Sequence, residues 1–411
     1  LLHSEIEKKR NHRPIRQLMQ QAGRAVQRIK PVFMMSPLSI AAYLPPGSVQ
    51  FDLVIFDEAS QVRPVEAFGA IVRGRQVVVV GDSRQLPPTP FFERLASGDD
   101  SDVANDNEAN VSGSQESILD LFCAQNAPQR LLRWHYRSRH ESLIALSNHL
   151  FYDRQLVIFP SPDGGKREVG LRYHHLPHTI YERGKSRTNP LEAAAVAQAV
   201  LHHAQTQPHL TLGVVAFSRG QQQAVRQAVE ALRRQHPAAE PFFRAHPAEP
   251  FFVKNLENVQ GDERDVILLS VGYGRAADNH LTLNFGPLNQ AGGERRLNVL
   301  ITRARCRCDL FTNLTPEDIE QRYPEAAGVV ALQRYLRYAA SGELADMPPE
   351  TAVSPAPFLH LLAADLTAQG HTVAERVGSG PVRVDLAIVG KDGRYTLGIA
   401  TDGDNYHQAR S

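Results

Sequence analysis

Two stretches of sequence decide the fold: FDLVIFDEAS at residues 51–60 and VVVVGDSRQLPP at residues 77–88. Each starts as an apolar run and ends in acids or small polar residues. This is the pattern of a buried parallel strand that carries a site at its carboxyl end. Two ordinary core strands would explain the apolar runs but not the composition of both ends. The pair therefore predicts an α/β fold with a site at one edge of a parallel sheet.

The polar residues at these strand ends suit phosphate chemistry. Asp57 can hold Mg²⁺, and its neighbour Glu58 can orient or deprotonate an attacking water. After the second run, the amide of Gln85 can reach a terminal phosphate and report its loss. Two such strands close together in the sequence are more specific than one isolated Asp-Glu pair.

The bulk composition is that of an ordinary soluble globular protein. The 411 residues are enough for two to three domains, each with its own core. The sequence holds 45 Lys and Arg against 44 Asp and Glu, so it has no global basic field. Any nucleic-acid binding must therefore rest on local clusters of charge.

The cysteines and the hydropathy bear on the compartment. Cys123, Cys306 and Cys308 are too few for a disulfide framework and indicate free thiols in a reducing environment. No apolar run approaches the length of a membrane span, and no signal peptide opens the sequence. We therefore expect a cytoplasmic protein with no membrane partner.

Strand-like and helix-like segments alternate along most of the chain, which predicts parallel sheets built from βαβ units. A polar stretch at 97–114 is expected to be a flexible surface loop. The expected helices cover residues 4–29, 64–71, 117–124, 141–148, 218–235 and 296–305, and the expected further strands begin near 32 and cover 211–217, 265–271 and 308–313.

The end of the chain has a different organisation. Residues 340–357 are a linker by composition, rich in Pro, Ser and Ala. A helix at 358–369 and two alternating strands around the turn Gly390–Gly393 then predict a hairpin in a separate domain.

One further feature is a near-repeat, HPAAEPFF at 236–243 and HPAEPFF at 246–252. A local duplication in a loop is the simplest explanation, and the sequence assigns it no function.

Five motifs occur in order: DEAS at 57–60, GDSRQLPP at 81–88, HYRSRH at 135–140, VQGDERD at 259–265 and LNVLITRAR at 297–305. Together they resemble superfamily 1 helicases, with the closest likeness to the subgroup of the nonsense-mediated-decay helicases. The resemblance implies an AAA-type motor of two RecA-like P-loop NTPase domains with ATP and Mg²⁺ in the cleft between them. The implied division is 1–126 for the last part of the first domain, 127–339 for the second, 340–357 for the linker and 358–411 for the start of a further domain.

The resemblance also assigns roles to single residues. It implies that Asp57 holds Mg²⁺, that Glu58 is the catalytic base and that Gln85 contacts the γ-phosphate. Arg137 and Arg303 correspond to two arginine fingers, although Arg137 on its own could equally be a surface or phosphate-contacting arginine. The remaining nucleotide contacts are Gln260 and Gly261, in the loop that links ATP state to strand grip, and Glu263, which bonds the ribose.

A P-loop is missing from the sequence as it stands. The one Gly-Lys-Ser run is Gly184–Ser186, but Thr179 stands where the first glycine of a P-loop belongs, and no apolar strand leads into it. We expect the P-loop to precede Leu1, and we expect this chain on its own to be inactive toward ATP.

The last 50 or so residues resemble the very-short-patch-repair-like branch of the PD-(D/E)xK endonucleases, a small restriction-endonuclease-like α/β fold. Asp385 corresponds to a metal ligand, and Asp402 and His407 are further candidates. Ala400 stands where an acid is expected, so nuclease activity is not a firm expectation.

The sequence therefore predicts an ATP-dependent helicase or translocase on single-stranded or forked nucleic acid. DNA is favoured over RNA because the appended domain resembles DNA-repair endonucleases. The alternatives are a structure-specific nuclease that the motor positions, and an ATP-gated binding switch that does not unwind. No feature of the sequence identifies a protein partner.

Overall fold

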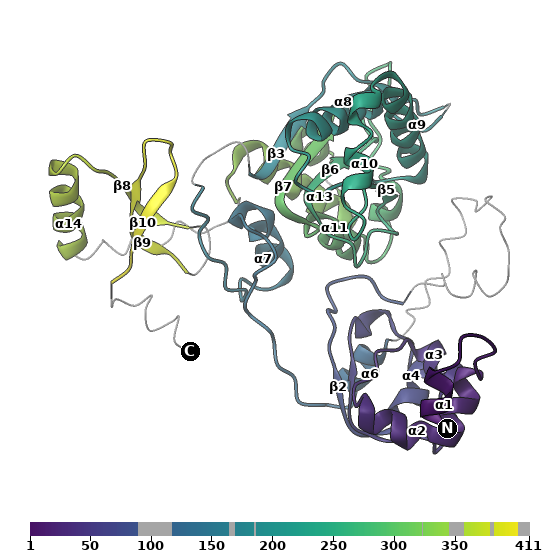
Figure 1. Ribbon diagram of the computed structural model, residues 1–411. Helices are drawn as coiled ribbons and strands as arrows, with labels where there is room; N and C mark the ends of the chain where they lie inside the picture. Colours follow the sequence, from purple (N-terminus) through teal and green to yellow (C-terminus); the bar gives the residue numbers. More distant parts are fainter. Residues whose placement is uncertain are drawn as a thin grey trace. The chain divides into compact units, whose positions relative to one another are not determined.

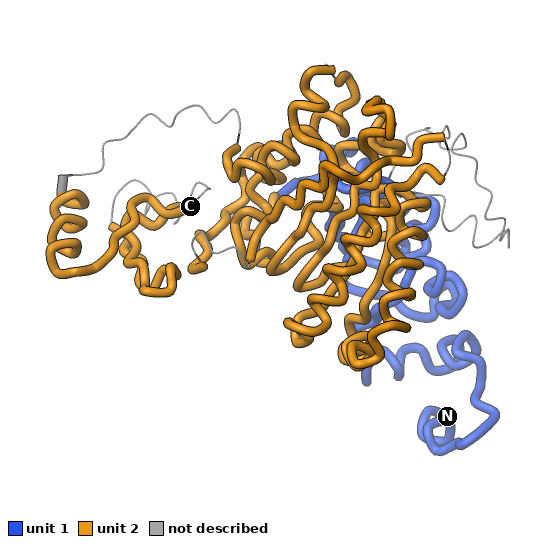
Figure 2. Tube along the Cα trace, turned by 90° about the horizontal axis from the view of Figure 1, so that it is seen from above, with its two compact units in different colours: residues 1–130 blue, residues 131–411 orange. Residues whose placement is uncertain are grey.

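The computed structural model describes residues 1–88, 117–163, 169–184, 186–322, 324–344, 357–378 and 382–401 (Figure 1). The chain separates into two compact units, unit 1 from Leu1 to Arg130 and unit 2 from Leu131 to Ser411 (Figure 2). The four-part division expected from the sequence stays a prediction. The polar stretch at 97–114 lies outside the described residues.

Unit 1 is built on two parallel strands, β1 (Phe51–Phe56) and β2 (Gly74–Val79). The expected helix α4 (Pro64–Ile71) connects them after one turn of 3₁₀ helix, η1 (Ala59–Gln61). With α6 (Ile118–Ala124), this βαβ element buries a cluster of apolar side chains: Phe56, Ala59, Ala67, Ala70 and Ile118. The sequence prediction of two parallel strands that end together is confirmed.

The N-terminal part of unit 1 differs from the prediction. The expected single helix over 4–29 is two helices, α1 (Leu2–Ile6) and α2 (Ile15–Ile29). Pro14 stands directly before α2, and because proline has no N–H and disfavours helical backbone in the residue before it, the helix cannot run through. The strand expected from residue 32 is absent from the structure. Helix α3 (Pro37–Tyr43) follows instead, and Ser36 caps it by accepting the N–H of Ser39 at 3.2 Å.

Unit 2 contains a five-stranded sheet in the order β3-β7-β6-β4-β5, with every described neighbour pair parallel. Its strands are β3 (Gly170–His175), β4 (Leu212–Ala216), β5 (Phe252–Asn255), β6 (Arg264–Ser270) and β7 (Ala304–Thr312). Both Val214 and Val215 of β4 are fully buried. Successive residues of a strand point to opposite faces, so both faces of the sheet are covered. The predicted α/β fold with a parallel sheet is confirmed.

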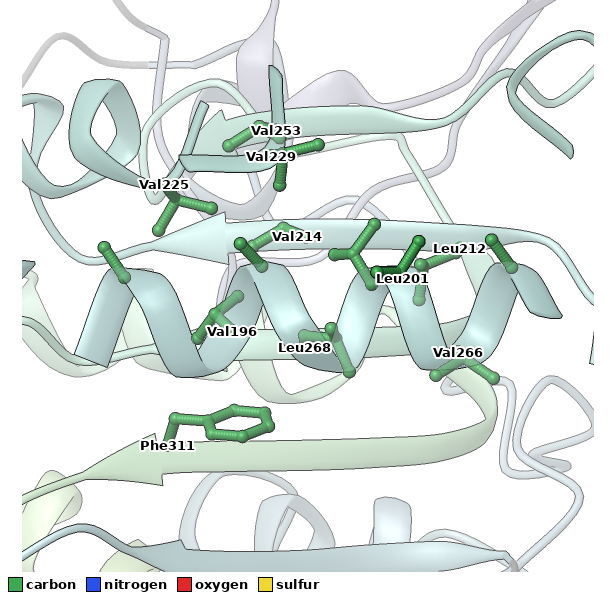
Figure 3. Close-up of a cluster of buried hydrophobic side chains, with 14 of the residues drawn as sticks. Val196, Leu201, Leu212, Val214, Val225, Val229, Val253, Val266, Leu268 and Phe311 are labelled. Atoms are coloured by element: carbon green, nitrogen blue, oxygen red, sulfur yellow. The ribbon is translucent and has the colours of Figure 1, made fainter. Parts of the chain in front are cut away.

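Helices α8 (Pro190–Thr206) and α9 (Arg219–Gln235) supply much of the core of unit 2. Figure 3 shows α8 lying along the sheet, with Val196 and Leu201 directed at Val214 and Leu268 of the strands. Helices α11 (Gly293–Ile301) and α13 (Ala327–Ser341) pack against each other. The shorter elements are η3 (Glu141–Leu143), α7 (Ala145–Phe151), η4 (Pro237–Ala239), α10 (Phe242–Ala245), η5 (Gly286–Asn289) and α12 (Pro316–Glu320).

The helix expected over 296–305 was placed too far along the chain. Helix α11 ends at Ile301, and β7 begins at Ala304 rather than at Cys308. Arg303 therefore lies in the turn between the two elements, and Arg305 lies in the strand.

The C-terminal part of unit 2 is a helix, α14 (Pro357–Ala368), followed by the strands β8 (Thr372–Val377), β9 (Val384–Val389) and β10 (Tyr395–Ile399). The expected hairpin of β9 and β10 is confirmed as an antiparallel pair, and β8, which the sequence did not predict, pairs with the other side of β9. Of the expected linker, residues 345–356 lie outside the described residues.

Candidate functional site

The two strand ends of unit 1 meet as predicted. The backbone N–H of Val80 donates to the carbonyl of Phe56 at 2.8 Å, and the N–H of Ala59 donates to the carbonyl of Val80 at 2.9 Å. These bonds carry the parallel pairing past the last residue of each strand. Asp57 and Glu58 therefore lie beside the segment that begins at Gly81. Both carboxylates are exposed to solvent.

The backbone at this edge is strained in the way that functional turns often are. Glu58 has a φ of +52°, in the left-handed region that costs a non-glycine residue on the order of 1 kcal/mol or more. A Cβ on Gly81 would lie 2.9 Å from the backbone nitrogen of Ser60, a distance that Cβ atoms essentially never show. Glycine at 81 thus allows the two strand ends to meet.

Hydrogen bonds hold the side chains of this edge. The carboxylate of Asp57 accepts the N–H of Glu58 at 3.0 Å, and Glu58 in turn accepts the amide of Gln61 at 3.1 Å. The amide of Gln85 donates to Asp82 at 2.9 Å. Asp57, Glu58 and Gln85 therefore follow the carboxyl-terminal ends of two neighbouring strands of one sheet. Exposed carboxylate and amide oxygens of this kind are the ligands that Mg²⁺ prefers, so the set fits the metal that the sequence implies.

In unit 2, three of the segments that carry the motifs meet at the amino-terminal ends of the strands β6 and β7. Arg137 Nε lies 2.7 Å from Glu263 Oε2, just before β6 begins. The N–H of Arg139 donates to the carbonyl of Arg305 near the start of β7 at 2.7 Å. The structure thus brings the segments 135–140, 259–265 and 303–305 together, although they are far apart in the sequence.

Arg303 has a different environment from Arg137. Its side chain is buried, and Nε donates to the carbonyl of Val299 at 2.7 Å while Nη2 donates to Thr302 Oγ1 at 2.9 Å. The guanidinium therefore binds the carboxyl-terminal end of α11, where a positive charge is favoured. The sequence resemblance did not anticipate that this arginine would be buried.

The loop around Gln260 and Gly261 lies beside the same cluster. Gly261 has a φ of +84°, which favours glycine, and Gln260 is half-buried. Within the described part of the chain, Gln260 Nε2 is buried without a hydrogen-bond partner. Buried amide donors nearly always have a hydrogen-bond partner. Gln260 Nε2 is therefore a candidate donor to a bound ligand or another group outside the described chain.

Three residues of this cluster were missed by the sequence analysis: Glu249, Asp265 and Arg305. Arg305 donates to Glu249 at 2.7 and 2.6 Å, to Asp265 at 3.0 Å and to Glu263 at 3.3 Å. The hydrogen bonds that Arg305 donates to Glu249 raise the pKa of its guanidinium. An open pocket of about 380 Å³ lies between residues 248–254 and 261–264. These contacts join residues up to 56 positions apart, so no local sequence signal could have revealed them.

The sequence analysis also missed His135, which supports the loop that carries Arg137. Burial, reinforced by the positive charge of Arg137, lowers the pKa of His135 to about 4. The imidazole is therefore neutral at pH 7, and its Nε2 accepts the N–H of Ser138 at 3.1 Å. A neutral, half-buried ring holds the loop that carries Arg137 through this bond to Ser138.

At the carboxyl-terminal ends of the strands of the same sheet lies a buried polar network. Glu192, at the start of α8, is fully buried and accepts from Ser270 Oγ at 2.7 Å and from the N–H of Gly272 at 2.8 Å. Gln221 of α9 donates to the same serine hydroxyl at 3.0 Å and to the carbonyl of Asn189 at 3.2 Å. Burial raises the pKa of Glu192 to about 8. The network ties the first turns of α8 and α9 to the end of β6.

The candidate endonuclease residues are only partly described. Asp385 lies on β9, and its carboxylate accepts the N–H of Thr401 at 2.7 Å and its hydroxyl at 2.8 Å. Asp402 and His407 lie outside the described residues, and Ala400 is exposed. Among the described residues there is no group of three or more His, Cys, Asp or Glu placed to share a metal ion.

The Gly184–Ser186 run is not placed like a P-loop. Ser186 donates its hydroxyl to Glu182 at 2.7 Å within a turn, and the next helix begins only at Pro190. Across the described ranges, no helix is both long and apolar enough to cross a membrane.

Comparison with known proteins agrees with this geometry. Two protein-family profiles, each described as an AAA domain, match residues 8–92 and 114–314, which together make up most of the chain. The first match contains Asp57, Glu58 and Gln85, and the second contains Arg137 and Arg303. Each profile therefore covers one half of the predicted site.

Similar proteins are named as helicases. The chain is 32% identical over 323 residues to the uncharacterized ATP-dependent helicase MG140 of Mycoplasma genitalium, a match to 76% of this chain and 28% of the relative. It is 31% identical over 318 residues to the homolog of that protein in Mycoplasma pneumoniae, with the same two coverages. It is 25% identical over 271 residues to the mouse 5'-3' DNA helicase ZGRF1, covering 63% of this chain and 12% of that protein.

The chain thus carries AAA domains similar to those of ATP-dependent helicases. Together with the parallel five-stranded sheet, the similarities support a superfamily 1 helicase family for it. The chain spans little more than a quarter of the length of the two Mycoplasma relatives.

Proposed function

We propose that the protein to which this chain belongs is an ATP-dependent helicase or translocase of the nonsense-mediated-decay-helicase-like subgroup. It acts on single-stranded or forked nucleic acid, with DNA favoured over RNA. The observation that carries the proposal is that Asp57 and Glu58 follow β1, and Gln85 follows β2, at the same end of the unit 1 sheet. The similarity to a mouse protein named as a DNA helicase supports the choice of DNA.

The acids of unit 1 divide the work of hydrolysis between them. Asp57 holds Mg²⁺, which neutralises the charge that develops on the phosphates. Glu58 orients the attacking water and takes its proton, and the left-handed backbone at Glu58 turns this carboxylate away from the line of the strand. Gln85, held by Asp82, contacts the γ-phosphate and changes partners when that phosphate leaves.

Unit 2 supplies positive charge to the same reaction. Arg137 and Arg303 stabilise the charge of the transferred phosphoryl group, while Gln260, Gly261 and Glu263 contact the nucleotide. Arg137 is exposed enough to act without rearrangement, whereas Arg303 first has to leave the carbonyl of Val299. Because the reacting groups come from both units, hydrolysis depends on the two units coming together.

We propose that the C-terminal strands belong to an endonuclease-like domain. Asp385 is its candidate metal ligand, with Asp402 as the second. The single arrangement that favours this reading is the β9–β10 hairpin, which places the end of β10 beside Asp385 through the two hydrogen bonds of Thr401. With Ala400 in place of an acid, we expect this domain to bind DNA and to cut it slowly or not at all.

One experiment separates the proposal from its two rivals. The full-length protein is mixed with a forked DNA and ATP, and strand separation, strand cleavage and binding are measured on that single substrate. A helicase separates the strands in an ATP-dependent manner. Cleavage without separation would favour a nuclease that the motor positions, and binding without either would favour an ATP-gated switch.

A further inference from the structure

The near-repeat of unit 2 places two similar glutamates in different surroundings. In the first copy, Glu240 accepts two hydrogen bonds from Arg233 of α9, at 3.0 and 2.6 Å. The same arginine lies over the ring of Phe243, 4.2 Å from its centre. This copy therefore closes on the helix that precedes it and has no direct part in the predicted site.

The second copy makes the same kinds of contact with two arginines, Arg305 and Arg264, that lie beside the predicted site. Glu249 accepts from Nη1 and Nη2 of Arg305 at 2.7 and 2.6 Å, a two-pronged pair like that of Glu240, which accepts from Nε and Nη2 of Arg233. The carbonyl of Pro250 accepts from Arg264 at 3.2 and 2.7 Å, and Arg264 lies 4.7 Å from the centre of the Phe252 ring. The second copy is thus bound to the first residues of both β6 and β7.

From Glu249 a continuous series of ion pairs leads to Arg137. Arg305 Nη1 donates to Glu249 at 2.7 Å and also to Glu263 at 3.3 Å, and the other oxygen of Glu263 lies 2.7 Å from Arg137. The hydrogen bonds of Arg305 lower the pKa of Glu249, so this carboxylate is charged at neutral pH. The series runs Glu249, Arg305, Glu263, Arg137, so negative and positive side chains alternate along it.

We propose that Glu249 is a positioning residue for Arg137, acting through Arg305 and Glu263. The inference rests on the proposed function, because it gives Arg137 its place in ATP hydrolysis. Glu249 engages two of the N–H groups of Arg305 and so holds that guanidinium at the longer distance of 3.3 Å from Glu263. Without Glu249, Arg305 stays bound to Asp265 through Nε at 3.0 Å, but its Nη1 and Nη2 are released to close on Glu263 and draw this carboxylate away from Arg137.

The chain contains its own matched control for this proposal. Glu249→Gln and Glu240→Gln each remove one carboxylate from the same short sequence and each break one two-pronged pair with an arginine. They differ in that only the pair of Glu249 continues to Arg137. The charges left behind are those of the two arginines: Arg233 is 34% exposed, and Arg305, at 21%, keeps Asp265 and Glu263 as partners.

The test uses the full-length protein with ATP and saturating single-stranded DNA. We expect Glu249→Gln to lower kcat about tenfold with less than a twofold change in KM, because a misplaced group that acts only in the transition state costs turnover rather than binding. We expect Glu240→Gln to match the unmodified protein and Glu249→Asp, which keeps the charge, to recover part of the lost kcat. Thermal melting of each variant checks the fold.

Other results would overturn the proposal. Equal kcat values for the two Gln variants would mean that the second copy has no special role. A rise in KM with kcat unchanged would place the effect on nucleotide binding instead of on Arg137. A fall in melting temperature that accompanies the fall in kcat and is not reversed in Glu249→Asp would make the role structural. Absence of ATP hydrolysis by the unmodified protein would instead refute the proposed function, and this inference with it.

Discussion

The two candidate arginine fingers present a contrast at the scale of single residues. The Arg137 side chain is 37% exposed and pairs with an equally exposed Glu263, an interaction worth about 0–1 kcal/mol in water. Arg303 is 3% exposed and satisfies a carbonyl at the end of α11. One arginine is therefore free to act with little cost, and the other also stabilises the fold.

We predict that Arg137→Ala lowers kcat on the order of a thousandfold and leaves the melting temperature unchanged. Steady-state hydrolysis and thermal melting of the full-length variant would check this. A variant that keeps its basal hydrolysis but no longer binds the strand would show that Arg137 contacts nucleic acid.

For Arg303→Ala we predict a similar loss of kcat together with a loss of stability of about 1–3 kcal/mol, because the carbonyl of Val299 and the hydroxyl of Thr302 lose a buried partner. Chemical denaturation measures the second effect. Unchanged stability would mean that the buried position of Arg303 contributes nothing to the fold.

How far the site could be predicted depends on how local its contacts are. Asp57, Glu58 and Gln85 could be assigned to one edge because the strands that carry them are parallel neighbours in the sequence. The burial of Arg303 and the pairing of Arg305 with Glu249 could not be assigned, because both follow from packing between segments that only the whole sheet brings together.

At the scale of elements, the sequence predicted the ends of α4, α9, β4 and β6 to within one residue and misplaced the boundary between α11 and β7. Runs such as 211–217 are apolar on both faces, and this pattern survives any change in neighbouring loops. The end of α11 was missed because Ile301, Thr302 and Arg303 are compatible with either helix or turn. Strand β8 was missed because its alternation of Thr372, Ala374 and Arg376 is weak.

Glu192 gives a prediction about the pH dependence of unit 2. Its pKa is raised from 4.5 to about 8 by burial, so the folded state holds a proton that the unfolded state has released between those two values. The contribution of Glu192 to stability therefore falls as the pH rises from about 4.5 to about 8, while His135, with its lowered pKa, contributes in the opposite direction below about pH 6.5. The total effect is on the order of a few kcal/mol, since each unit of pKa shift corresponds to about 1.4 kcal/mol.

Glu192→Gln should remove this part of the slope of unfolding free energy against pH, because glutamine keeps an acceptor for Ser270 and cannot ionise. Chemical denaturation of the chain at pH 5, 6, 7 and 8, followed by circular dichroism, would measure it against the unmodified chain. If the slope of the variant equals that of the unmodified chain, another group causes the pH dependence.

At the scale of the whole molecule, the C-terminal domain is where the family resemblance and the residues disagree. Asp385 binds Thr401, while Ala400 has no group that could bind a metal. We predict that Ala400→Glu raises Mg²⁺-dependent cleavage of DNA by the full-length protein and that Asp385→Ala abolishes any cleavage. Efficient cutting that survives Asp385→Ala would remove Asp385 from the metal site and the endonuclease resemblance from this segment.

Our main proposal for unit 1 is that it carries the acids of an ATPase that responds to nucleic acid. The most direct measurement is ATP hydrolysis by the full-length protein, with and without single-stranded DNA, for the unmodified protein and for Glu58→Gln. We predict weak ATP hydrolysis that single-stranded DNA stimulates. In Glu58→Gln the rate of hydrolysis should fall at least about a hundredfold while Mg²⁺-ATP binding stays nearly intact. Near-normal hydrolysis by Glu58→Gln would contradict the assignment of Glu58 as the base.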